Sequence, residues 1–190
     1  MSSENFQNAL LALEKYHLFI VQGLTSHQKF VEIGPPEFQT GPLLIPYLDK
    51  GNYSLITDKE IELWKINQSC FFHNVSIPKK PKVYVTPNFN LSECEKADFV
   101  SINMLFPHFT VRQIASFLAD IKQILNPKSL VVIDYIEGNE DCNNTFSERL
   151  DGLYKYHVGT IKNISEAAGF DFYPVPSMNF GELNFGFLKT

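Results

Sequence analysis

The sequence has few of the features that mark a specialised class of protein. Its 190 residues contain three cysteines, an odd number, and no Cys-x-x-Cys pair, so it suggests neither a zinc site nor a disulfide framework. No apolar run approaches the roughly 20 residues of a membrane span, and the chain does not begin with the basic start and apolar core of a signal peptide. We therefore expect a soluble, cytoplasmic protein that has neither a membrane segment nor a metal site.

The chain also lacks a basic stripe. Its formal net charge is -5, and the densest positive cluster, Lys79-Lys80-Pro81-Lys82, has the composition of a solvated loop before a strand. Duplex nucleic acid is therefore not an expected partner. A content of 44% hydrophobic and 19% charged residues fits a single globular domain over 1–190 with a substantial core.

Short apolar runs bounded by turn signals alternate with amphipathic segments along most of the chain. The expected strands are 30–33, 53–57, 82–86, 98–105, 129–135, 170–175 and 183–189. The expected helices are 42–49, 60–68, 110–125, 157–168 and a short one around 146–154. This alternation predicts a parallel sheet with helices on both faces, and the short link 176–182 predicts an antiparallel return.

The first 28 residues are expected to form a helical segment before the sheet domain 29–190. A helix beginning near Ser2 or Ser3 would place a set of mostly apolar residues on one face, which we expect to be buried. These residues are Phe6, Ala9, Leu10, Leu13 and His17.

The stretch 29–41, KFVEIGPPEFQTG, is the centre of the expected site. It reads as a strand, a tight turn at Gly34-Pro35-Pro36, and the start of a helix. In an α/β sheet, the end of such a strand is where a nucleotide-like ligand binds.

Three further segments give the chain a resemblance to a known family. Asp98–Phe109 resembles the fourth-strand pattern of class I S-adenosylmethionine (SAM) methyltransferases, with Asn103 and His108 at its polar positions. Phe117–Asp134 is similar to the family's helix, turn and fifth strand, with Lys128 and Ser129 in place of two turn glycines. Ala167–Phe170 matches the usual entry into the sixth strand.

The resemblance covers about 29–189 and implies a three-layer α/β sandwich. Its seven-stranded sheet would be mostly parallel with an antiparallel last strand, and SAM would be the cofactor. The first motif departs from the family pattern, because Glu32 and Gly34 match but Pro36 and Phe38 replace glycines. Proline fixes φ and removes an N–H donor.

Two functions therefore remain open. The first is a SAM-dependent methyltransferase that acts on a small or medium acceptor. The second is a methyltransferase-like domain that has lost this chemistry and binds a partner or another ligand.

The resemblance implies cofactor contacts from Glu32, Gly34, Pro36, Asp58 and Asn88. Glu32 would hold the methionyl ammonium, or else take part in a buried ion pair. Asp58 would bind the ribose hydroxyls, or else cap a helix. Asn88, or Thr86 in its place, would lie near adenine, although turn chemistry also explains this segment.

Asn103 and Met104 would line the cleft where the fourth strand ends. His108 is a candidate general base, with helix entry as the other interpretation. His157 fits a helix cap better than a catalytic role. The segment 137–156 is expected to form a mobile cover over the cleft that selects the acceptor, or else a helix fixed on the sheet.

Overall fold

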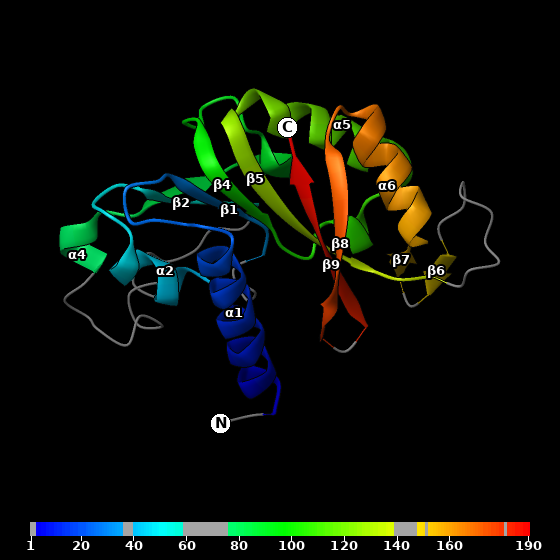
Figure 1. The fold of residues 1–190 in the computed structure, drawn as a ribbon, viewed down its shortest axis with the longest axis horizontal. Coiled ribbons are helices and arrows are strands. Elements are labelled where there is room, and N and C mark those ends of the chain that lie inside the picture. Colours follow the sequence, from blue (N-terminus) through cyan, green and yellow to red (C-terminus); the bar gives the residue numbers. More distant parts are fainter. Residues whose placement is uncertain (1–2, 36–39, 59–75, 139–147, 151, 181) are drawn as a thin grey trace.

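The computed structural model describes residues 3–35, 40–58, 76–138, 148–150, 152–180 and 182–190. A seven-stranded sheet in the order β3-β2-β1-β4-β5-β9-β8 forms its centre (Figure 1). The strands are β1 Phe30–Ile33, β2 Tyr53–Thr57, β3 Lys82–Val85, β4 Ala97–Ile102, β5 Leu125–Ile136, β8 Asp171–Phe180 and β9 Leu183–Lys189. Strands β1 to β5 pair in parallel, whereas β9 runs antiparallel to both β5 and β8. The predicted seven-stranded sandwich with its antiparallel last strand is confirmed.

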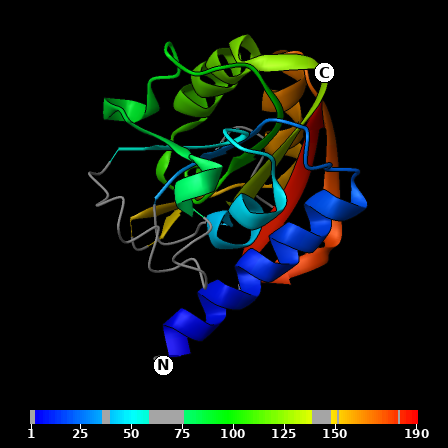
Figure 2. The ribbon, with the colours of Figure 1, turned by 90° about the vertical axis from the view of Figure 1, so that its left-hand side faces the viewer.

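Helices cover both faces of the sheet, with α5 and α6 on one face and α1 and α2 on the other (Figures 1 and 2). The helices are α1 Ser3–Val21, α2 Gly41–Tyr47, α4 Ser76–Lys79, α5 Val111–Gln123 and α6 Val158–Ala167, with short 3₁₀ turns η2 Pro87–Phe89 and η3 Phe106–His108. Every residue of β1 and β2 is buried, as parallel strands between two helical layers should be.

Two apolar clusters hold the layers together. Ile114, Leu118 and Ile161 pack from α5 and α6 against one face of the sheet, and Phe19 and Leu44 pack from α1 and α2 against the other. Each such side chain contributes roughly 1.5–3 kcal/mol when fully buried. The core therefore packs on both faces of the sheet. The ends of the strands are where a site can form.

The buried face of α1 differs from the expected one. Leu10 and Leu13 are 36% and 41% exposed, His17 is exposed as well, and the side chains of Phe6 and Ala9 lie outside the described part. The buried stripe is instead Leu11, Lys15 and Phe19. These residues have the four-residue spacing of one helix face. The sequence did not reveal this face, because its middle residue, Lys15, is charged and breaks the apolar pattern.

The helix expected around 146–154 is wrong where the structure describes it. Strands β6 Glu148–Leu150 and β7 Leu153–Lys155 form an antiparallel hairpin instead. Gly152 between them has φ +87, which glycine adopts at little cost. Residues 139–147 and 151 lie outside the described part, and the mobility expected for 137–156 stays a prediction.

Other segments also differ from the expected ones. Strand β8 continues through Pro176 to Phe180, with a register shift between Pro174 and Asn179, because the prolines are accommodated at an irregular edge strand. Residues Ser76–Lys79 form a short helix where a loop was expected. The helix expected at 60–68 lies outside the described residues.

Thr110 caps the start of α5. The Oγ1 of Thr110 accepts a hydrogen bond from the Gln113 backbone N–H, and the Gln113 side chain accepts one from the Thr110 N–H. This reciprocal arrangement is a capping box. His157 likewise caps α6 by accepting a hydrogen bond from the Gly159 N–H at 3.1 Å.

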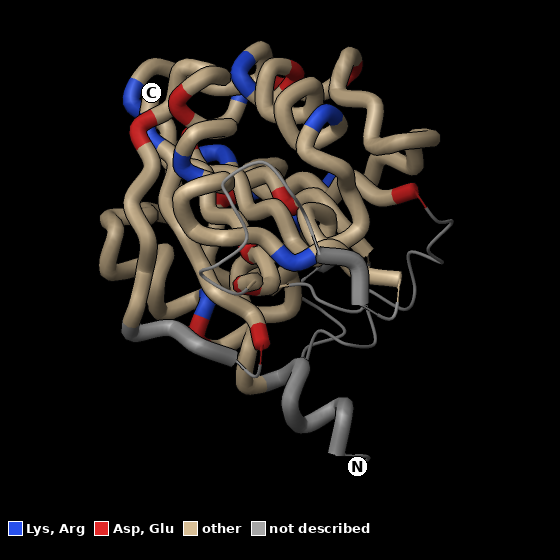
Figure 3. Tube along the Cα trace, turned by 90° about the vertical axis from the view of Figure 1, so that its right-hand side faces the viewer, with Lys and Arg blue, Asp and Glu red and all other residues tan. Residues whose placement is uncertain are grey.

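In the part of the chain that is described, no helix is both long and apolar enough to cross a membrane. The view in Figure 3 shows Lys and Arg residues interspersed with Asp and Glu residues along the described trace. The absence of duplex nucleic acid among the partners stays a prediction.

Candidate functional site

The carboxyl ends of β1 to β4 bring most of the predicted site residues to one edge of the sheet. Strands that run in parallel end at the same edge, so residues that follow them in the sequence meet there. The predicted residues at this edge are Glu32 and Gly34 from β1, Asp58 after β2, Asn88 after β3, and Asn103 and Met104 after β4. Pro36, like Phe38, lies outside the described residues.

A cavity of about 530 Å³ opens at this edge. Three predicted residues line it: Asp58, Asn88 and His108. The lining is completed by Pro35, Phe89, Leu105, Phe109, Gln113, Ser116, Phe117 and Asp120. The contribution of α5 was missed, because Gln113, Ser116 and Asp120 read in the sequence as an ordinary exposed helix face.

The cavity is acidic. Asp58 and Asp120 both line it, and its described lining contains no Lys or Arg. Phosphate groups are normally held by such cations or by clustered backbone N–H donors. Phe89, Leu105 and Phe117 provide apolar surface for a flat ring. The cavity thus suits an uncharged or cationic ligand with hydroxyl or amino donors better than a nucleotide phosphate.

Glu32 is fully buried and does not line this cavity. Its Oε1 accepts hydrogen bonds from the Thr40 N–H at 2.7 Å and from Asn103 Nδ2 at 2.7 Å. Its Oε2 accepts one from the Tyr53 hydroxyl at 2.6 Å. Burial raises the pKa of Glu32, and the hydrogen bonds and the nearby Lys15 only partly offset this. Glu32 therefore has protein partners of its own, and its contact with a cofactor stays a prediction.

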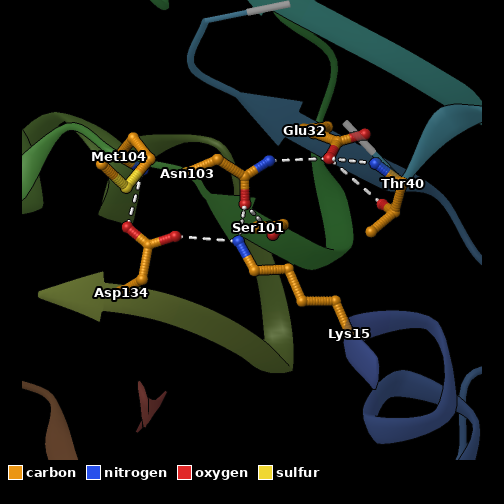
Figure 4. A network of polar contacts seen from close by, with 7 residues as sticks. All are labelled: Lys15, Glu32, Thr40, Ser101, Asn103, Met104 and Asp134. Carbon is orange, nitrogen blue, oxygen red and sulfur yellow. Dashed lines mark hydrogen bonds and ion pairs between the residues drawn. The ribbon is translucent and has the colours of Figure 1, made fainter. Parts of the chain in front are cut away.

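Lys15 is a further residue at the strand ends that the sequence did not reveal. Its side chain is 1% exposed, and its Nζ donates hydrogen bonds to Asn103 Oδ1 at 2.7 Å and to Asp134 Oδ2 at 2.8 Å (Figure 4). The Phe185 ring lies 5.4 Å from the same ammonium, within cation–π range. A buried ammonium needs such partners, and only the packing of α1 on the sheet supplies them.

Asn103 has the partners expected for a polar residue at the end of an apolar strand. Its amide bridges Glu32 and Lys15, and its Oδ1 also accepts a hydrogen bond from the Ser101 hydroxyl at 2.8 Å (Figure 4). Asp134 continues this chain of contacts, since its Oδ1 accepts a hydrogen bond from the Met104 N–H at 2.6 Å. The polar network thus crosses the ends of β1, β4 and β5.

The backbone at this edge adopts two unusual conformations. Gly34 has φ +144 and Met104 has φ +52. Residues other than glycine rarely adopt either conformation. Gly34 lies against the backbone of Asn103, the residue before Met104. Among the described residues, no group of three or more His, Cys, Asp or Glu is arranged to hold a metal ion.

This strand order, with an antiparallel strand inserted between β5 and β8, is the fold of the class I SAM-dependent methyltransferases. The magnesium protoporphyrin IX methyltransferase of Synechocystis PCC 6803 with bound S-adenosylhomocysteine (SAH) has a TM-score of 0.71 and 10% sequence identity, over 97% of this chain and 83% of its own. The 1,6-didemethyltoxoflavin-N1-methyltransferase of Burkholderia thailandensis has a TM-score of 0.65 and 16% identity, over 100% of this chain and 78% of its own.

A third similar structure is a putative O-methyltransferase from Nostoc punctiforme PCC 73102, with a TM-score of 0.66 and 12% identity. This chain covers 55% of that protein, about half of its length. No family model matches the sequence, and no curated protein matches it significantly. The similarity therefore establishes the fold, and the residues of the site must support any function.

Proposed function

We propose that this protein is a SAM-dependent methyltransferase that acts on a small or medium acceptor. The observation that carries the proposal is the acidic cavity of about 530 Å³ at the carboxyl ends of the strands. In the same fold, one similar structure holds SAH and another holds SAH together with its small-molecule substrate.

The cavity would take the nucleoside half of SAM. The carboxylate of Asp58, which lines the cavity, would accept hydrogen bonds from two ribose hydroxyls. Asn88 and the apolar residues Phe89 and Leu105 would bind adenine. Asp58 and Asp120 favour a ligand whose sulfonium is positively charged over one with phosphates. The chemistry of the lining therefore fits this cofactor.

The polar network would organise the methionyl end. Glu32 fixes the start of α2 through Thr40, and Gly34 and Met104 form the edge against which this end would lie. We assign Glu32 a positioning role in addition to the predicted contact. Pro36 keeps its predicted contact as a proposal.

Bound SAM would supply an electrophilic methyl group for an in-line displacement. The protein would contribute mainly orientation, which supplies up to roughly 7–11 kcal/mol in favourable cases. His108 lines the cavity and is the candidate to accept a proton from the acceptor. A methyl transfer to an acceptor that is already nucleophilic needs no such base.

Calorimetric titration with SAM and SAH tests the proposal. We expect binding by the wild-type protein, and at least tenfold weaker binding by Asp58→Asn, because charge-assisted hydrogen bonds contribute roughly 1.5–3 kcal/mol each. Asp171→Asn is the matched control, since Asp171 is exposed at the start of β8, at the opposite edge of the sheet. No heat and no thermal shift at millimolar SAM or SAH would overturn the proposal.

One observation favours the second candidate, a methyltransferase-like domain without this chemistry. Glu32 and Lys15 are both buried and already engaged by protein groups, and two consecutive prolines follow Gly34. A folded protein that fails to bind SAM or SAH would support this candidate. Saturable SAM binding that depends on Asp58 would exclude it.

A further inference from the structure

Helix α5 forms one wall of the cavity, and Lys15 lies on the opposite face of the sheet. A series of contacts nevertheless connects Lys15 to residues that line the cavity. Helix α1 is anchored on both sides of Lys15, since Leu11 and Phe19 are buried one turn before and one turn after it. The ammonium is therefore held at a fixed place at the ends of β4 and β5. There it pairs with Asp134, whose side chain has no exposed surface.

The two carboxylate oxygens of Asp134 accept hydrogen bonds from two different parts of the chain. Its Oδ2 pairs with Lys15 at 2.8 Å, and its Oδ1 accepts a hydrogen bond from the Met104 N–H at 2.6 Å (Figure 4). Met104 has φ +52, a left-handed conformation that a residue with a side chain adopts only when its surroundings impose it. The hydrogen bond from the Met104 N–H to the Asp134 carboxylate therefore helps to hold the turn at Met104 in this conformation.

The turn at Met104 determines where the following residues lie, and these residues form one wall of the cavity. The next residues, Leu105 and the 3₁₀ turn Phe106–His108, follow it directly. Leu105, His108 and Phe109 all line the 530 Å³ cavity. A change in the backbone at Met104 would therefore displace these three residues together.

We propose that Lys15 is a positioning residue for this cavity and that it acts through Asp134 on the turn at Met104. Without the ammonium, Asp134 would be a buried carboxylate short of a cationic partner, and it would turn toward water or take up a proton. Either change weakens its hold on the Met104 N–H. The N-terminal helix thereby determines the shape of a ligand site that it does not line. The ligand used in the test, SAH, rests on the function proposed above.

The test compares two variants that break the chain of contacts at different links. Lys15→Met keeps an unbranched side chain of similar length but removes the charge. Asp134→Asn leaves a single acceptor oxygen, which can serve the Lys15 ammonium or the Met104 N–H but not both, and it decides the test if Lys15→Met does not fold. Ile164→Ala, at a buried position of α6, is the control for loss of stability alone.

Two readouts are measured at a temperature where every protein is more than nine-tenths folded. We expect SAH to bind at least tenfold more weakly to Lys15→Met and Asp134→Asn, and within twofold of wild type to Ile164→Ala. We also expect the amide hydrogens of 104–109 to exchange faster in the first two variants only.

Unchanged SAH affinity in both link variants would overturn the proposal, as would an equal loss in Ile164→Ala. If wild type itself does not bind SAH, the function proposed above fails and hydrogen exchange alone decides this one. Faster exchange confined to 104–109 then supports it, and unchanged exchange there overturns it.

Discussion

Gly34 lies so close to Asn103 that a Cβ atom added at position 34 would be 2.3 Å from the Asn103 carbonyl oxygen. The neighbour is backbone at the end of a buried strand, so it cannot move aside as a flexible side chain can. The contact joins the turn after β1 to the end of β4. A glycine is therefore required here both by this contact and by its φ of +144.

Gly34→Ala should lower the free energy of unfolding by about 3 kcal/mol, the sum of backbone strain and steric overlap. Gly23→Ala is the matched control, because Gly23 also has a positive φ of +91 but no atom within 4 Å of an added Cβ. It should cost only about 1 kcal/mol, the strain alone. Urea denaturation of both variants measures the difference, and equal losses would show that the contact with Asn103 does not matter.

Lys128→Gly should stabilise the protein. Lys128 has φ +65 at an irregular point within β5, where its pairing with β4 shifts register, and the methyltransferase pattern has glycine at this position. Relief of the left-handed strain is worth about 1 kcal/mol. Thermal and urea unfolding check the gain, with Lys96→Gly in the loop before β4 as a comparison. A loss of stability in Lys128→Gly would mean that its side chain makes a contribution larger than the strain.

The pH dependence of stability should reveal the buried carboxyl of Glu32. Burial raises its pKa above the ordinary value of 4.5, so the folded state holds this proton more tightly than the unfolded state does. The stability that this contributes is complete below pH 4.5 and is lost as pH rises through the folded pKa.

The free energy of unfolding of wild type relative to Glu32→Gln should therefore fall with rising pH, by up to about 1.4 kcal/mol per pH unit. Urea denaturation of both proteins from pH 4 to 8 measures it. The constant offset between them reflects the altered hydrogen bonds to Tyr53 and Thr40, so the slope is the test. A difference that does not change with pH would contradict the raised pKa.

Cys94 should react slowly with alkylating reagents. Burial raises the pKa of its thiol from 9.0 to about 11, and the thiolate is the reactive form. At pH 7.5, alkylation by iodoacetamide should be roughly 100-fold slower than that of a cysteine with the ordinary pKa. Peptide mapping by mass spectrometry over time measures the rate at this position. A rate equal to that of free cysteine would show that the thiol is not protected.

Several elements were predictable because their signals are local. The helix start at Thr110 follows from a capping pattern, and the left-handed turn at Lys128 falls where the family has glycine. The buried strands β1 and β2 read as short apolar runs between turn residues. The hairpin at 148–155 was missed because its apolar residues also fit a helical period, and the geometry of Gly152 decided between the two.

The candidate site shows the same division. Asp58 and Asn88 could be placed because each directly follows a strand, and parallel strands share one carboxyl edge. Gln113, Ser116 and Asp120 could not, because nothing local distinguishes them from a solvated helix face. Their role arises only from the packing of α5 beside that edge.

The sequence by itself determined the seven strands of the main sheet, the antiparallel return of β9 and the glycine at the first turn, because periodicity and turn chemistry act over a few residues. The tertiary structure alone decided the partner of Lys15, which is 119 residues from Asp134 along the chain. A lone lysine on a helix is ordinarily solvated. It becomes a buried ion-pair partner only when packing removes water from it and brings a carboxylate from β5 within 2.8 Å.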